Sequence, residues 1–182
     1  MLLRDCYFIL FLLLPLIFSG IFHSILISKK MLPQLAIPIH EKAFGKNKTI
    51  RGFIFIPLTA MLGGYLTFLL QPNSLFQIFP NIHESLLAGF LLGIAYAIGE
   101  LPNSYWKRKK GIKEGKKSTK KNRFLHIIVD QCDSAFPVML FYLYYHPMVN
   151  LKIATSAIAI SILVHLLINF LLYVFKLRRE PL

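Results

Sequence analysis

Five apolar stretches follow one another along the chain, separated by polar segments. They occupy residues 6–27, 53–70, 85–101, 127–145 and 149–175, and each is close to the roughly 20 residues that a helix needs to cross a bilayer. The third is the shortest and the fourth contains two carboxylates, so their ends are the least sharply marked. The pattern predicts an all-α integral membrane protein, a single domain over residues 1–182 built as a bundle of about five transmembrane helices.

The first stretch also begins like a secretory signal peptide, because Arg4 precedes a run of hydrophobic residues. Such peptides have an apolar region of roughly 7–15 residues. Here the apolar residues continue to Ile27, which is long enough to span a bilayer. We therefore favour a first helix that is retained in the protein.

Basic residues are distributed very unevenly between the polar segments. Of the 21 Lys and Arg residues, six lie in residues 28–52, ten in 102–126 and three in the C-terminal tail, whereas the other side has only Arg4 and Lys152. Cytoplasmic segments carry the excess of Lys and Arg in membrane proteins. The distribution predicts an outside N-terminus, five spans, two basic cytoplasmic loops and a cytoplasmic C-terminus.

These loops explain how a chain that is 55% hydrophobic carries a formal net charge of +13. A composition this apolar is typical of a small multi-pass protein of the cytoplasmic membrane. Basic loops beside a bilayer attract anionic headgroups and anionic substrates. We expect membrane lipids as partners, and no nucleic acid.

Asp130 and Asp133 form the most informative polar pair, because the chain has only eight acidic residues. A charge near hydrocarbon is costly and marks a functional-site candidate. On a helix the i, i+3 spacing puts both carboxylates on one face. Hard carboxylate oxygens there suit Mg²⁺, which usually takes one or two carboxylates and shares phosphate oxygens with a substrate. The alternative is a pair that the basic loop merely neutralises.

A second polar cluster lies at residues 44–52, where the second span begins. Glycines, an amide, a hydroxyl and three cations occur within nine residues, a composition that suits phosphate binding. The spacing is not that of a Walker A loop. Ordinary basic anchoring at the membrane surface is the competing interpretation. The candidate ligands are Lys48, Thr49 and Arg51.

The third cluster follows the third span, at residues 100–108. Glu100 ends an apolar stretch, where a carboxylate requires a partner, and Pro102 is expected to break or bend the helix. The polar residues beyond it would then sit in a turn or a cap. A simple salt bridge of Glu100 at the interface, with Tyr105 and Trp106 as an aromatic belt, explains the segment equally well. The candidates here are Asn103, Ser104, Lys107 and Arg108.

All three clusters belong to the predicted cytoplasmic side, and together they suit phosphoryl or nucleotidyl transfer, in which a metal and cations offset the charge on phosphates. A site at a membrane surface implies a lipid as second substrate. A transporter that uses Asp130 and Asp133 as a cation site is the alternative. It would place polar residues near the middle of several spans, whereas these spans have very few polar residues. A scaffold that binds anionic lipid would tolerate loss of both aspartates.

Gly89 and Gly93 form a GxxxG pair in the third span. Small residues at this spacing let membrane helices approach closely. We favour packing inside the bundle, with a homodimer as the alternative.

Three motifs in order give the chain a family resemblance. They are Phe44-Gly45-x-Asn47-Lys48-Thr49-x-Arg51-Gly52, then Gly99-Glu100-Leu101-Pro102-Asn103-Ser104-x-x-Lys107-Arg108-x-x-Gly111-Ile112, then Asp130-Gln131-x-Asp133-Ser134. In these motifs, in its length and in its five-span layout, the chain resembles CDP-archaeol synthases and their bacterial relatives. The resemblance covers roughly residues 30–175.

The resemblance implies a membrane nucleotidyltransferase of phospholipid biosynthesis. Such an enzyme transfers CMP from CTP to a lipid phosphate, either an archaeal ether acid or a phosphatidate-type acid, and gives a CDP-lipid and diphosphate with Mg²⁺ as cofactor. By the same resemblance, Asp130 and Asp133 would hold the metal and act in catalysis with Lys107. The expected substrate-binding residues are Lys48, Thr49, Arg51, Asn103, Ser104 and Arg108.

Overall fold

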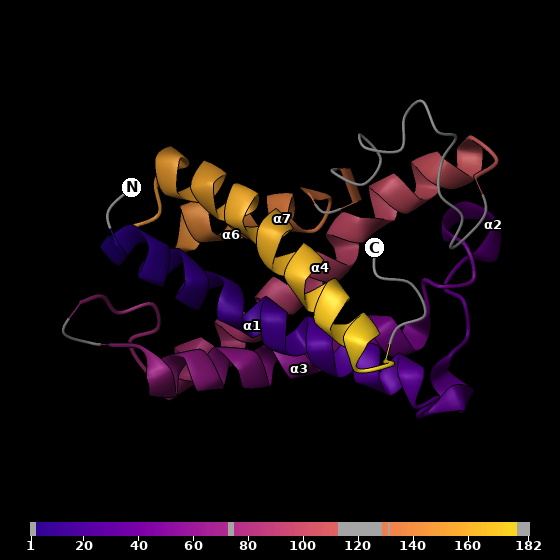
Figure 1. Ribbon diagram of the computed structural model, residues 1–182, viewed down its shortest axis with the longest axis horizontal. Coiled ribbons are helices and arrows are strands. Elements are labelled where there is room, and N and C mark those ends of the chain that lie inside the picture. Colours follow the sequence, from indigo (N-terminus) through magenta and orange to yellow (C-terminus); the bar gives the residue numbers. More distant parts are fainter. Residues whose placement is uncertain (1–2, 73–74, 113–128, 131, 178–182) are drawn as a thin grey trace.

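The computed structural model describes residues 3–72, 75–112, 129–130 and 132–177, which fold almost entirely into helices (Figure 1). Four helices in this part of the chain are long and apolar enough to span a membrane: α1 (Leu3–Ser28), α3 (Ile50–Leu70), α4 (Ile82–Lys109) and α7 (Leu151–Val174). A shorter apolar helix, α6 (Ala135–Tyr145), corresponds to the described part of the fourth predicted span. The protein is therefore an all-helical integral membrane protein, as the apolar pattern predicted.

Two short elements lie in the loop between α1 and α3. They are a 3₁₀ turn, η1 (Pro33–Leu35), and one turn of helix, α2 (Glu41–Phe44). An antiparallel bridge between Pro38 and Thr49 closes the loop at its base. The most lysine-rich segment of the chain, residues 113–123, and the start of the predicted fourth span lie outside the described residues.

Polar side chains fix where three of the long helices begin. The side-chain oxygens of Thr49, Asn81 and Asn150 accept hydrogen bonds from the backbone N–H groups of Gly52, Glu84 and Ile153. Each bond satisfies an amide that has no partner within the first turn of a helix.

Pro102, which was expected to break or bend the third span, does not break it. Helix α4 runs through Pro102 without interruption and ends at Lys109. A proline inside a helix removes one backbone hydrogen bond, and membrane helices tolerate this where neighbouring groups satisfy the freed carbonyl. The consequence matters for function, because Glu100, Asn103 and Lys107 now share one helical face instead of lying in a turn.

Helices α3 and α4 pack so closely that Gly89 and Gly93 have no room for a side chain. A Cβ added at Gly89 would lie 2.5 Å from the Ala60 carbonyl oxygen, and one at Gly93 would lie 2.5 Å from Pro57 Cα. Both partners belong to α3, so the GxxxG pair packs inside the bundle as predicted.

The helices run back and forth between two ends of the molecule. The N-terminus, the 71–81 loop and the 146–150 loop meet at one end, where Arg4, Phe76, Met148 and Lys152 line one small pocket. The other end carries α2 and the C-terminal part of α4 (Figure 1). The core between them consists of side chains such as Phe8, Leu12, Phe79, Leu92 and Tyr142.

Candidate functional site

The side-chain amide of Asn103 joins the two aspartates. Asn103 Nδ2 donates a hydrogen bond to Asp130 Oδ1 at 2.7 Å and another to Asp133 Oδ2 at 2.8 Å. One neutral group therefore holds two like charges side by side. The geometry brings the second half of α4 and residues 130–133 into a single site.

Two lysines complete an alternating array of charges around this amide. Lys107 forms an ion pair with Asp130, and Lys48 forms one with Glu100. Both lysine side chains are largely buried, with 19% and 16% of their surface exposed. Paired charges that are shielded from water interact more strongly than surface pairs. The array holds three carboxylates and two ammonium groups, drawn from three separate segments.

Close backbone packing brings these segments together. A Cβ added at Gly99 would lie 2.8 Å from the Asp133 carbonyl oxygen and 2.4 Å from Pro137 Cγ, so only glycine lets the turn before α6 approach α4 this closely. Lys48 is positioned from the other direction. Its backbone carbonyl accepts a hydrogen bond from the Ile39 amide at 2.9 Å within the loop.

Asp133 lies in the turn before α6, outside the four membrane-spanning helices. Burial, and after it the negative charge of Glu100, raises the pKa of the Asp133 carboxyl to about 7. The Asn103 hydrogen bond and Lys48 act in the opposite direction without cancelling the rise. A cation placed beside such a carboxyl would stabilise its ionised form.

The oxygen atoms around Asp133 fit a hard cation. Asp133 Oδ1 and Asn103 Oδ1 are both buried and have no hydrogen-bond partner among the described residues. The same part of the chain contains no group of three or more His, Cys, Asp or Glu side chains that could hold a metal by themselves. Two carboxylates and an amide oxygen still fit Mg²⁺, because that ion completes its shell with water and substrate phosphates.

The other predicted ligands are near the array in sequence, but the structure shows Thr49 and Arg51 in contacts outside the array. Thr49 caps α3 with its hydroxyl oxygen. Arg51 is only 8% exposed, donates from Nη1 to the Met31 carbonyl at 2.7 Å, and has a buried Nε with no partner among the described residues. Ser104 and Arg108 belong to the same stretch of α4 as Asn103 and are half-buried.

Tyr96 and Ser134 were missed from the sequence as neighbours of the array. The Tyr96 side chain lies near Glu100, Asp133 and Ser134. Tyr96 lies one helical turn before Glu100 and Ser134 directly follows Asp133, so their spacing from the named carboxylates was the available signal.

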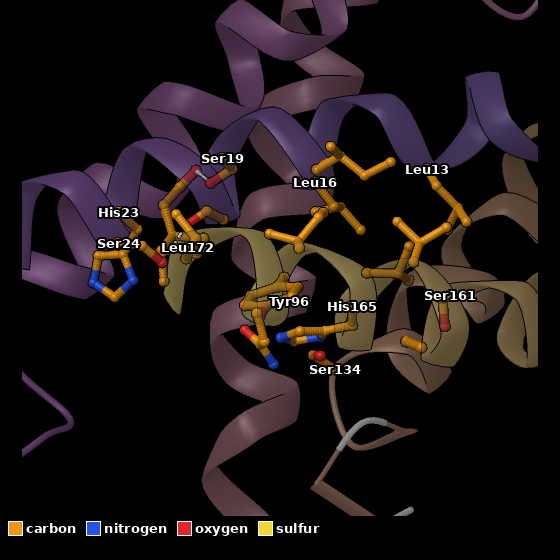
Figure 2. Close-up of a pocket in the computed structure, with 18 residues that line it drawn as sticks. Leu13, Leu16, Ser19, His23, Ser24, Tyr96, Ser134, Ser161, His165 and Leu172 are labelled. Atoms are coloured by element: carbon orange, nitrogen blue, oxygen red, sulfur yellow. Dashed lines mark hydrogen bonds between the residues drawn. The ribbon is translucent and has the colours of Figure 1, made fainter. Parts of the chain in front are cut away.

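Both residues also line a cavity of about 160 Å³ that lies between α1 and α7 (Figure 2). The remaining wall comes mainly from these two helices and from the first turn of α6. The charged array and the cavity therefore share the turn before α6 and the stretch of α4 from Tyr96 to Glu100.

Comparison with known proteins identifies the family. Residues 2–181 match the family described as CarS-like, CDP-archaeol synthase. The CDP-archaeol synthase of Pyrobaculum islandicum is 28% identical over 141 residues, which cover 78% of this chain and 74% of the relative. That of Methanospirillum hungatei is 29% identical over 146 residues, which cover 78% of this chain and 82% of the relative. No solved structure is significantly similar. The chain belongs to the CDP-archaeol synthase family and is a membrane cytidylyltransferase.

Proposed function

We propose that this protein transfers CMP from CTP to the phosphate of a membrane lipid. A phosphate oxygen of the lipid attacks the α-phosphorus of CTP, a new phosphorus–oxygen bond forms, and the bond between the α-phosphorus and the bridging oxygen breaks. Diphosphate leaves and a CDP-lipid remains in the membrane. The reaction needs no covalent enzyme intermediate, so positioning and charge stabilisation carry the catalysis.

The observation that carries this proposal is the Asn103 amide bonded to both Asp130 and Asp133. These two carboxylates would hold Mg²⁺ against the CTP phosphates, with the amide oxygen of Asn103 within the same shell. When bound, the ion would neutralise charge on the phosphates and orient them. One buried oxygen each of Asp133 and Asn103, without a partner among the residues that the structure describes, supports the assignment.

Lys107 and Lys48 supply the mobile positive charge of the proposed site. Each now pairs with a carboxylate, Asp130 or Glu100, and each could move to a phosphate oxygen once nucleotide and metal bind. Lys107 lies closest to the metal-binding carboxylates and is assigned to the reacting phosphates. We assign the remaining predicted residues to triphosphate and lipid phosphate: Thr49, Arg51, Ser104 and Arg108.

The acceptor lipid is assigned by its chemistry as a phosphate monoester of a glycerolipid. The two relatives named above are CDP-archaeol synthases, which favours an ether-linked acid, and a phosphatidate-type ester is the second acceptor to test. The charge distribution favours an active site on the cytoplasmic side, where CTP is made. The product would serve phospholipid synthesis.

The test is incorporation of CMP, carrying label in its cytosine ring, into chloroform-soluble product. Purified protein in detergent receives labelled CTP, Mg²⁺ and either an ether-linked or an ester-linked glycerolipid phosphate. We expect labelled lipid with at least one acceptor, and release of one diphosphate for each CMP transferred. No labelled lipid with either acceptor, from protein that still unfolds cooperatively on heating, would overturn the proposal and leave cation transport as the function to examine.

A further inference from the structure

The cavity between α1 and α7 has a wall of mixed chemistry. Eight leucine, isoleucine and valine side chains line it, and two histidines, an asparagine, a tyrosine and four serines also face it. In Figure 2, Tyr96, His165 and Ser134 group on one side, whereas Leu13 and Leu16 lie along α1. Cavities that stay empty are apolar, whereas polar ones hold water or a ligand. The mixture suits a ligand that is itself part polar and part apolar.

The cavity meets the charged array at its polar side. Ser134 follows Asp133 directly, and Tyr96 lies one helical turn before Glu100 on α4. His23, also in the cavity wall, lies against the first turn of α3, since a Cβ added at Gly52 would be 3.2 Å from its Nε2. That turn contains Arg51, whose buried Nε has no partner in the described part of the chain. A ligand in the cavity can thus place an anionic end beside these residues.

The size of the cavity limits which part of a lipid it can hold. A cavity of about 150 Å³ admits a molecule of the size of benzene, and this one measures about 160 Å³. Six heavy atoms match a glycerol unit and its linkages, whereas two long chains need many times that volume. The chains must therefore leave the cavity toward the bilayer.

We propose that this cavity binds the glycerol and linkage region of the acceptor lipid phosphate, so that the protein selects its acceptor there rather than by chain length. The inference rests on the proposed function for the identity of the acceptor. Polar groups that bond a ligand discriminate strongly against analogues without the matching group. Apolar chains lying in the bilayer give no comparable discrimination.

Gly20 offers a way to fill the cavity without disturbing its wall. Gly20 lines the cavity, and a Cβ added there meets no atom within 4 Å. Gly20→Leu should therefore occupy cavity space while the helix is kept, and Gly20→Ala provides a smaller step. Ala159→Leu is the matched control, because Ala159 is an exposed residue of α7 outside the cavity wall.

Two measurements test the proposal. In mixed micelles, Gly20→Leu should raise the KM for the lipid phosphate at least tenfold with the KM for CTP nearly unchanged, while Ala159→Leu should behave as the wild type. Without CTP, glycerolipid phosphates with short and long chains should raise the melting temperature of the wild type and of Ala159→Leu equally, but not that of Gly20→Leu. The second measurement needs no turnover.

The outcomes separate this inference from the proposed function. Lipid phosphate that stabilises Gly20→Leu as much as the wild type, or that stabilises neither, overturns the cavity assignment. A parallel rise in both KM values, or a steep dependence on chain length, overturns it too. Cavity-dependent stabilisation without any CDP-lipid product would support the cavity assignment and reject cytidylyl transfer.

Discussion

At the scale of single residues, Asn103 matters most because it keeps two carboxylates together without neutralising either. Its amide bonds both Asp130 and Asp133, while Lys107 covers only one of them. A pair of adjacent like charges needs such a group, since two carboxylates side by side repel each other. A cation that bound Asp130 would take the place now held by Lys107.

Replacing Asn103 by alanine should remove the group that orients the pair. We expect Asn103→Ala to lower kcat/KM for cytidylyl transfer by about 100-fold, because the two carboxylates lose the amide that orients them and the proposed ion loses an oxygen, and to raise the Mg²⁺ concentration needed for half-maximal rate. Initial rates across a Mg²⁺ series measure both effects. Glu41→Gln is the control, because Glu41 forms only an exposed ion pair with Lys46. An unchanged Mg²⁺ dependence would contradict the assignment of Asn103.

Asp133 should be still more sensitive. Its carboxyl has one buried oxygen without a partner among the described residues, so Asp133→Asn removes charge where the proposed ion needs it. We expect turnover to fall by at least about 1,000-fold, a loss of about 4 kcal/mol of transition-state stabilisation. The melting temperature without metal should stay the same or rise, because burial already disfavours the charged carboxylate. Retained turnover would exclude Asp133 as a metal ligand.

The sequence alone could predict part of this site and not the rest. The i, i+3 spacing of Asp130 and Asp133, in a chain with only eight acidic residues, indicated a cation site. Which lysine would face which carboxylate was not predictable, because Lys48 and Glu100 are 52 positions apart and meet only through tertiary packing. The one signal for Tyr96 was its spacing from Glu100, which is weak because a tyrosine in an apolar span usually belongs to the core.

At the scale of elements, the continuous helix α4 explains how the site is built. Residues 100, 103 and 107 share a face only because α4 continues past Pro102. The interpretation of Pro102 as a helix breaker applied a rule of water-soluble proteins. In a membrane helix, neighbouring groups can satisfy the carbonyl that proline leaves without a partner, and the helix continues. The close packing at Gly89 and Gly93 was predictable, because the GxxxG spacing puts two small residues on the same helical face.

The packing of α3 on α4 should be sensitive to a single side chain. Gly89→Leu would force a Cβ to within 2.5 Å of the Ala60 carbonyl oxygen, and both backbones would have to move. We expect a loss of about 3 kcal/mol or more in unfolding free energy, seen as a lower melting temperature in detergent. Gly20→Ala, with free space around its Cβ, should leave the melting temperature unchanged or raise it. Equal stabilities of the two variants would contradict the observed packing.

At the scale of the whole molecule, the segments that the charge distribution assigns to opposite sides of the membrane lie at opposite ends of the fold. The 71–81 and 146–150 loops lie together, since His146 Nε2 is 2.9 Å from the Gln77 carbonyl oxygen. The charged array lies at the end that carries α2 and the C-terminal half of α4 (Figure 1). Alternation of the helices could be predicted from apolar lengths and basic loops, because both reflect the membrane rather than tertiary contacts.

The orientation of these ends makes a prediction for the protein in living cells. Leu75, which is 54% exposed, belongs to the predicted outer end, and Lys46, whose side chain is 71% exposed, belongs to the predicted cytoplasmic end. In a background with Cys6→Ser and Cys132→Ser, a membrane-impermeant maleimide should label Leu75→Cys in intact cells. It should label Lys46→Cys only after permeabilisation. The reverse pattern would place the proposed active site outside the cell, away from the CTP supply, and would contradict cytidylyl transfer from the cytoplasmic side.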